Sequence, residues 1–369
     1  MNKKLKVLEV SSNPIERGLQ IGEENAFLIK EFVSMVHENY RELCGGILEI
    51  EEVREHLGKC LDISQKFAPD LYIELEGIAK ASNVAIDDII FINSFLELIN
   101  FRFPKTCKEI FGCTSLGVAN DNEDNKKVYV AQNYDMEKYY KDYITLIKIK
   151  ERETDTLLIT FAGVLGCIGF NSCGIGLNIN YLQANDLGTG ILYPFVVRKA
   201  LQQNRIGDAL GAITTGFKAS GMNYLLSDSL GNIFDIEMAG KDFDILQMKD
   251  GFMSHSNHYK SEKLIKKDMM AYDLSLDSSF SRRGSTIIRE HVCNKLLNKR
   301  KESFVLEDIK NILTDHTNYP YSICKHGDLN EDKYRGNETV FSSIFDLESR
   351  EAHIAIGTPC KSDYFKYKL

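Results

Sequence analysis

The feature that most constrains the fold is a change in hydrophobic pattern at residue 112. Before it, apolar residues recur at helical spacing and predict helices over 23–44, 53–67, 71–81 and 86–100. After it, short alternating stretches bounded by turn residues predict strands over 115–119, 128–135, 143–151, 156–162 and 170–182. Helices then follow over 191–204, 206–217, 281–298 and 306–313, with a hairpin over 223–239, a strand over 242–248 and a final hairpin of strands 339–347 and 351–356. The sequence predicts an α+β fold with a mostly antiparallel sheet, divided at residue 112.

Charge and hydropathy exclude several classes of function. The formal net charge is −8 and no basic patch stands out, which argues against a nucleic-acid-binding protein. The first residues carry lysines but no apolar core of a signal peptide, and they predict a strand. The most apolar run, 89–99, is shorter than a membrane span and is interrupted by polar residues. We expect a cytoplasmic protein with no membrane contact.

The nine cysteines fit a reducing compartment, because their number is odd and none forms a C-x-x-C pair. We expect neither a disulfide framework nor a metal site. The nearest approach to metal-ligand spacing is His255 and His258, which have no cysteine partners nearby and lack the H-E-x-x-H pattern.

Cys113 follows Gly112 at the start of the first predicted hairpin, and it has two interpretations. It is either one more small buried residue or a nucleophile that needs activation, since the thiolate is the reactive form. If the bond between Gly112 and Cys113 is cut, the freed α-amino group, with a pKa of about 7.7–8.0, supplies a base on the same residue. Gly112 has no Cβ, so the thiol can approach its carbonyl group. Spacing alone leaves both interpretations open.

Further motifs occur along nearly the whole chain in a fixed order. They are Glu74-Leu75-Glu76-Gly77-Ile78-Ala79, Gly112-Cys113-Thr114, Gln132-Asn133-Tyr134-Asp135, Gly169-Phe170-Asn171-Ser172, Gly221-Met222, Ser254-His255-Ser256-Asn257-His258, Asn318-Tyr319-Pro320-Tyr321-Ser322-Ile323-Cys324 and Arg335-Gly336. Together they resemble the isopenicillin-N acyltransferase family, whose members are N-terminal nucleophile hydrolases. The glutamine at position 132 resembles the acyltransferase branch of this family, since related amidases carry arginine at that position.

The resemblance implies a four-layer αββα sandwich preceded by a helical pro-segment. Residues 1–112 would be the pro-segment, which stays associated as a small subunit after autoproteolysis between Gly112 and Cys113. Residues 113–369 would be the large subunit. The implied reaction is acyl transfer or hydrolysis at an amide or thioester, through an S-acyl-Cys113 intermediate.

The resemblance also implies roles for single residues. Cys113 would be the nucleophile, Asp135 would orient its amino group or thiol, and Asn257 would donate its amide to the oxyanion. Arg335 would position the nucleophile or substrate, and Asn178 would line the substrate pocket. The alternatives are a turn aspartate at 135, a loop amide at 257 and a surface arginine at 335. We expect His255 and His258 to be structural.

The implied partners are a small-molecule acyl donor and an acceptor that is either water or an amine. No cofactor is expected, with acyl-coenzyme A as a candidate co-substrate, although no phosphate-binding glycine-rich loop is present. Two alternatives remain open: an amidohydrolase of lipid or amino-acid N-acyl amides, and an uncleaved binding protein with the same fold.

Overall fold

A computed structural model describes residues 4–44, 51–102, 112–120, 126–151, 153–186, 188–269, 277–299, 303–327 and 336–369. The helices are α1 (Pro14–Glu24), α2 (Ala26–Cys44), α3 (Glu51–Phe67), α4 (Pro69–Ser82), α5 (Ile86–Ile92), α6 (Phe95–Arg102), α7 (Tyr193–Leu201), α8 (Ile206–Thr214), α10 (Asp277–Asn298) and α11 (Leu306–Leu313). Two short 3₁₀ helices are η1 (Lys138–Tyr143) and η2 (Ile265–Lys267). No helix in these described ranges is both long enough and apolar enough to cross a membrane.

The described strands form two sheets. Sheet A contains, in spatial order, β1 (Val7–Val10), β4 (Ile144–Ile149), β5 (Thr156–Phe161), β6 (Ile168–Asn171), β7 (Ile175–Leu182), β8 (Gly221–Asp228), β9 (Ile233–Met238) and β10 (Phe243–Gln247). Sheet B contains β11 (Phe252–His255), β2 (Gly112–Ala119), β3 (Val128–Glu137), β12 (Asn337–Asp346), β13 (Glu351–Ile356) and β14 (Phe365–Lys368). Only the β1–β4 pair among them is parallel. The prediction of a mostly antiparallel sheet is confirmed.

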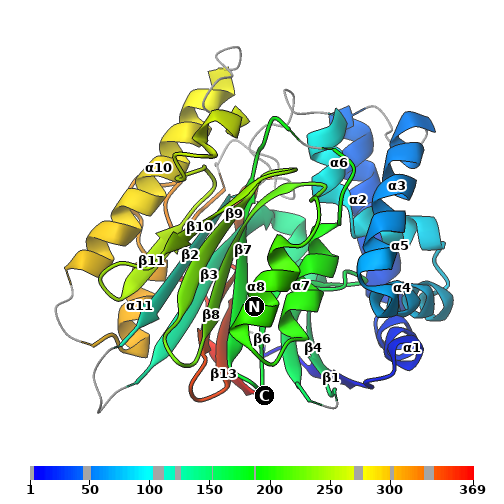
Figure 1. Cartoon of the computed structure of the whole chain (residues 1–369), viewed down its shortest axis with the longest axis horizontal. Coiled ribbons are helices and arrows are strands. Elements are labelled where there is room, and N and C mark those ends of the chain that lie inside the picture. Colours follow the sequence, from blue (N-terminus) through cyan, green and yellow to red (C-terminus); the bar gives the residue numbers. More distant parts are fainter. Residues whose placement is uncertain are drawn as a thin grey trace.

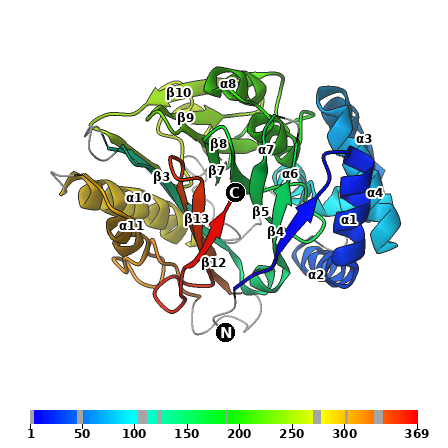
Figure 2. The same cartoon turned by 90° about the horizontal axis from the view of Figure 1, so that it is seen from below.

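The two sheets stack face to face and helices cover their outer faces (Figure 1). Helices α10 and α11 lie on sheet B, whereas α7 and α8 lie on sheet A. The sheets approach closely at Gly117 of β2, where a Cβ would lie 3.1 Å from the side chain of Ile233 in β9. Viewed from below, helices α1–α4 lie beside β4 on the side opposite α10 (Figure 2). The predicted four-layer αββα sandwich is confirmed.

Strand β2 places Cys113 between the two sheets. Side chains alternate along a strand, so one set of β2 residues faces the helices and the other faces sheet A. Leu116 and Val118 belong to a core cluster with residues of α10 and α11. Ser115 points the other way, and its hydroxyl donates to Asn180 Oδ1 of β7 over 2.6 Å. Cys113 lies on the same side of β2 as Ser115.

The helical prediction for the first third was largely right, with two differences. Helix α1 was not predicted, although Asn13 caps it by accepting from the Glu16 N–H and Pro14 occupies the first turn. The predicted helix over 86–100 is split in two at Asn93. The Asn93 side chain donates to Gly163 O over 2.9 Å and accepts from Leu165 N–H over 2.9 Å, so it ties the break to the loop after β5. Strands β11 and β14 were also not predicted.

A buried charge group joins the first third of the chain to the rest. The Glu74 carboxylate of α4 accepts from Arg17 Nε of α1 over 2.6 Å. It also accepts from Nη1 and Nη2 of Arg198 in α7 over 2.7 and 3.0 Å. All three side chains are at most 2% exposed. Burial alone would raise the pKa of Glu74, but Arg198 and Arg17 outweigh burial and hold the pKa below its usual value. Because α7 follows residue 112 in the chain, this group binds the two predicted parts together.

The group depends on a close approach of α1 and α4. A Cβ at Gly18 would lie 2.1 Å from the Glu74 carbonyl oxygen, and one at Gly77 would lie 2.7 Å from the Ile15 carbonyl oxygen. Only glycine at these two positions allows the backbones to touch, which brings Arg17 within reach of Glu74.

We predict that Glu74→Gln lowers the free energy of unfolding by about 3–5 kcal/mol, because it removes the buried carboxylate that pairs with the guanidinium groups of Arg17 and Arg198. Glu76→Gln is the matched control, since Glu76 is exposed on the same helix and should change stability by less than about 0.5 kcal/mol. Urea unfolding of both variants checks this. Equal midpoints for the two variants would show that the buried group does not stabilise the fold.

Candidate active site

The main chain of Cys113 is held from two sides. Its N–H donates to Asn257 Oδ1 over 2.8 Å. Its carbonyl oxygen accepts from Arg289 Nη1 of α10 over 2.6 Å, and the same nitrogen reaches Thr114 Oγ1 at 2.9 Å. The second guanidinium nitrogen, Nη2, donates to Asn257 Oδ1 over 2.9 Å. Cys113, Asn257 and Arg289 therefore form one hydrogen-bonded unit around the start of β2.

The side-chain amide of Asn257 has a fixed orientation. Its oxygen accepts two hydrogen bonds, and its nitrogen donates to Tyr181 O of β7 over 3.0 Å. In the intact chain the oxygen of the amide, not its nitrogen, faces Cys113. The oxyanion role expected for Asn257 needs the nitrogen and stays a prediction, whereas the contact with Cys113 N–H gives this residue a positioning role.

Three residues on one face of helix α10 bind Asn257 and its neighbour His258. Thr286, Arg289 and Glu290 are three and four residues apart, so they lie on the same side of the helix. Thr286 Oγ1 accepts from the Asn257 main-chain N–H over 2.7 Å. Glu290 Oε2 pairs with His258 Nε2 at 3.0 Å. The helix thus fixes the Asn257 backbone with one residue, its side chain with a second and its neighbour with a third.

The histidines beside Asn257 point into a buried charged cluster and not toward Cys113. His255 Nε2 lies 2.9 Å from Glu237 Oε1 of β9, and His255 Nδ1 lies 2.8 Å from Ser256 O. Lys260 Nζ pairs with Glu290 Oε1 at 2.9 Å. These contacts support the structural role that we expected for both histidines.

Asp135 of β3 lies opposite Gly112 in the β2–β3 ladder. Its Oδ1 accepts from Thr339 Oγ1 over 2.7 Å, whereas its Oδ2 is buried and has no hydrogen-bond partner among the described residues. A Cβ at position 112 would lie 3.0 Å from Asp135 Oδ2 and 3.5 Å from Lys325 Nζ. Glycine therefore leaves room for a carboxylate and an ammonium group beside the bond that precedes Cys113.

Burial and the nearby charges shift both titrating groups. Burial, followed by the Asp135 carboxylate, raises the pKa of the Cys113 thiol to about 12. Burial raises the pKa of Asp135 to about 6, although Lys325 and Arg289 oppose that rise. At neutral pH Cys113 is a thiol and Asp135 a carboxylate. An intact chain would need a proton acceptor to use this thiol, and the Asp135 carboxylate is the charged group that acts most strongly on the thiol pKa.

Two comparisons with known proteins bear on this site. A family model described as "Acyl-coenzyme A:6-aminopenicillanic acid acyl-transferase" matches residues 121–361, which is more than half of the chain. The chain belongs to this family. The "Acyl-coenzyme A:6-aminopenicillanic-acid-acyltransferase 40 kDa form" of Emericella nidulans is 26% identical over 321 residues, covering 85% of this chain and 82% of the relative. The region matched by the family model contains Asp135, Asn178, Asn257 and Arg335, and it begins after Cys113.

Solved structures were compared as well. Penicillin V acylase from Agrobacterium tumefaciens has a TM-score of 0.43 and 10% identity, covering 66% of this chain and 83% of that chain. A mutant of conjugated bile acid hydrolase from Clostridium perfringens has a TM-score of 0.41 and 11% identity, covering 69% and 97%.

The structure of this acyltransferase family member brings together three of the predicted site residues, Cys113, Asp135 and Asn257. Asn178 lies on β7 of the facing sheet, fully buried, and neither polar atom of its side chain has a partner among the described residues. Its pocket role stays a prediction. Arg335 lies outside the described residues. Arg289 was missed, because a single arginine on a helix has no local signature.

We predict that Arg289→Lys lowers the free energy of unfolding by about 1.5–3 kcal/mol. One ammonium group cannot reproduce the guanidinium fork that reaches Cys113 O, Thr114 Oγ1 and Asn257 Oδ1. Hydrogen exchange over residues 114–119 should rise in this variant. Arg205→Lys is the control, because Arg205 is exposed and pairs only within its own helical turn in the described part of the chain. Unchanged exchange over 114–119 in Arg289→Lys would contradict the positioning role.

Proposed function

We propose that this family member is a self-processing cysteine N-terminal nucleophile enzyme that transfers acyl groups through Cys113. The observation that carries the proposal is the position of the Gly112–Cys113 bond. It lies at the start of an interior strand of sheet B, between a buried carboxylate and an amide oxygen that already holds the Cys113 nitrogen. Membership of a family named for an acyl transfer supports it.

In the first stage the chain cuts itself. Asp135 accepts the thiol proton, and the sulfur of Cys113 attacks the carbonyl carbon of Gly112. The C–N bond breaks, the nitrogen takes up a proton, and a thioester joins Gly112 to the Cys113 sulfur. Water then hydrolyses this thioester to a Gly112 carboxylate and a free thiol. The Cys113 nitrogen becomes an α-amino group and keeps Asn257 Oδ1 as its acceptor.

In the second stage the freed amino group is the base for turnover. Its ordinary pKa of about 7.7–8.0 is close to neutral, so it can accept the thiol proton and return a proton to the leaving group. The sulfur attacks the carbonyl carbon of an amide or thioester donor and expels an amine or a thiol. The S-acyl-Cys113 intermediate then passes its acyl group to water or to an amine.

Asp135 Oδ2, which has no hydrogen-bond partner in the described part of the chain, gives the carboxylate a role in both stages. An orphan buried carboxylate oxygen is costly, and the new ammonium or amine of Cys113 would satisfy it once Gly112 moves away. Thr339 fixes the other oxygen, so Oδ2 is the atom left for the reaction.

The substrate class is the open part of this proposal, and activity should be tested against parallel panels. N-acyl amides with water as acceptor test the amidohydrolase, and acyl-coenzyme A thioesters with an amine acceptor test the transferase. Release of amine from the first panel without transfer in the second would assign an amidohydrolase of N-acyl amides. Activity on neither panel, from a chain that stays intact, favours a binding protein.

We predict that the purified protein consists of two associated fragments, residues 1–112 and 113–369, and that the larger begins Cys-Thr-Ser-Leu. Cys113→Ala should remain one inactive chain, because the thiol is needed for scission and again for turnover. Cys173→Ala, a change at a partly exposed cysteine, is the control and should cut normally. Intact mass and N-terminal sequencing check this. An active wild-type protein that stays uncut would overturn the self-processing mechanism.

We predict that the rate of scission falls about tenfold for each pH unit below pH 6, because Asp135 loses the charge that accepts the thiol proton. A carboxyl whose pKa is raised by folding stabilises the folded state most at low pH and loses that contribution as pH rises through 6. Titration of Asp135 therefore cannot unfold the chain as pH falls. Slower scission at low pH would then reflect the loss of the proton acceptor and not unfolding. Asp135→Asn should cut slowly, and its plot of log rate against pH should show no change of slope near pH 6. A change of slope at the same pH in that variant would assign the ionisation to another group.

A further inference from the structure

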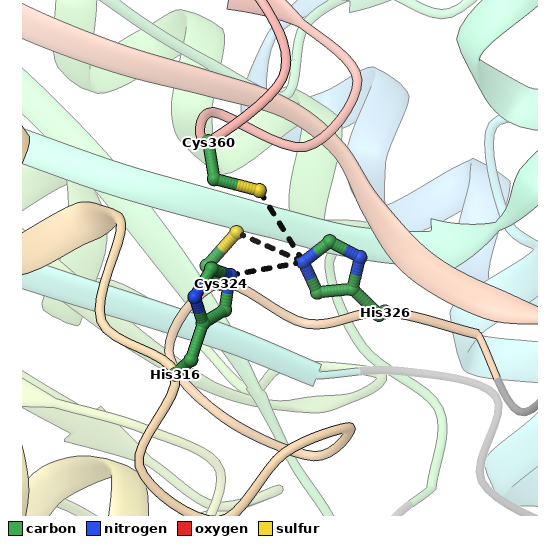
Figure 3. A group of neighbouring side chains, drawn as sticks. All are labelled: His316, Cys324, His326 and Cys360. Carbon is green, nitrogen blue, oxygen red and sulfur yellow. Dashed lines mark hydrogen bonds between the residues drawn. The ribbon is translucent and has the colours of Figure 1, made fainter.

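Two histidines and two cysteines converge on one point (Figure 3). His316 follows α11, Cys324 and His326 belong to the next segment, and Cys360 comes from the turn between β13 and β14. Their ligand atoms all lie within 4.8 Å of one another. His326 Nε2 lies 3.1 Å from His316 Nε2, 3.5 Å from Cys324 Sγ and 3.4 Å from Cys360 Sγ.

Ordinary hydrogen bonds do not account for this arrangement. An imidazole nitrogen carries either one hydrogen or one lone pair, so His326 Nε2 can make one good hydrogen bond and not three. A single cation in the middle would satisfy all four atoms together, because each of them can direct a lone pair toward it.

Three of the six spacings between these ligand atoms are close to those of a tetrahedral zinc site, and none of the six exceeds 4.8 Å. Bond lengths of about 2.3 Å for Zn–S and about 2.05 Å for Zn–N give tetrahedral edges of about 3.3 Å between nitrogens and about 3.5 Å between nitrogen and sulfur. The same lengths give about 3.8 Å between the two sulfurs. The three measured distances agree with the corresponding edges to within about 0.3 Å, close to the tolerance for such sites.

We propose that His316, Cys324, His326 and Cys360 bind one structural Zn²⁺ ion. Two thiolates and two imidazoles in a tetrahedron are a donor set that selects zinc, and four protein ligands leave no open position for catalysis. Binding replaces the two thiol protons, which pass to solvent, so the filled site carries no net charge. The site lies outside the group around Cys113 and does not depend on the proposed acyl transfer.

The surrounding main chain already holds the ligands in position. Cys324 N–H donates to Asp315 O over 3.0 Å, and His326 N–H donates to Pro320 O over 2.9 Å. These bonds fold the segment from 315 to 326 back on itself. The ion would then join this folded segment to the β13–β14 turn, with three ligands from one side and Cys360 from the other.

The ion would also fix a residue beside the scission bond. Lys325 lies between two of the ligands, and its N–H donates to Thr339 Oγ1 over 3.1 Å, while Thr339 Oγ1 donates to Asp135 Oδ1. Lys325 Nζ is one of the groups that would meet a Cβ at position 112. The zinc site thereby holds the segment that carries Lys325 against Asp135 and Gly112.

The sequence alone predicted no metal site, and the reason is spacing. The ligands follow one another at intervals of eight, two and thirty-four residues, with no C-x-x-C or H-x₃-H pair. Only the return of the chain through β12 and β13 brings Cys360 beside the other three.

The test uses full-length protein without a histidine tag, purified under reducing conditions with no added metal. Elemental analysis should find one zinc per chain. His316→Ala and Cys360→Ser change the two exposed ligands, so both variants should fold; each should lower zinc content more than about tenfold. Cys173→Ser is the matched control and should retain the metal. Zinc content that is the same in Cys360→Ser and Cys173→Ser would overturn the proposal.

A second measurement is independent of the variants. Wild-type protein stripped with a chelator and titrated with Co²⁺ should develop the visible absorption of tetrahedral cobalt with thiolate ligands, saturating at one ion per chain. Zn²⁺ should displace this absorption. Failure to take up Co²⁺ would refute the site, as would a Cys324–Cys360 disulfide, seen as the loss of two hydrogens in the mass of freshly purified protein.

Discussion

The geometry of the site depends on the guanidinium group of Arg289. One rigid fork reaches the carbonyl oxygen of Cys113, the hydroxyl of Thr114 and the amide oxygen of Asn257. A buried cation without such partners would cost several kcal/mol, so helix α10, strand β2 and the segment at Asn257 are stable only when they are together. Burial raises the pKa of Asp135 to about 6, and the positive charges of Lys325 and then Arg289 oppose that rise.

Much of the fold followed from local patterns, because the periods of buried side chains differ between helices and strands. Helix α11 and strand β13 have the bounds that the sequence predicted. The misses depend on contacts with residues distant in the chain, which a local pattern does not capture. Asn93 ends α5 through bonds to a loop seventy residues later in the chain, and β11 is a four-residue strand that is defined by its pairing with β2.

The site was predictable only where its residues lie in motifs. Cys113, Asp135 and Asn257 were found through the family resemblance, and the structure places them together. Arg289 and Lys325 each bring a positive charge to the site. Each of them reaches the site through the packing of a segment that is distant in the sequence, so no motif marks it. The role of Asn257 shows another limit. Its sequence neighbours identify the residue, yet only the bond to Tyr181 O shows which atom of its amide faces Cys113.

Strand β1 has a consequence for the larger of the two predicted fragments. It precedes residue 112, yet it pairs in parallel with β4 and forms one edge of sheet A. Leu5 N–H also donates to the Tyr367 hydroxyl of β14, so the first residues bridge both sheets. Residues 113–369 alone would present β4 as an open edge able to pair with another chain. If the chain is cut after Gly112, residues 1–112 would cover β4 with a four-residue strand, and an edge strand that short offers another chain few main-chain groups to pair with.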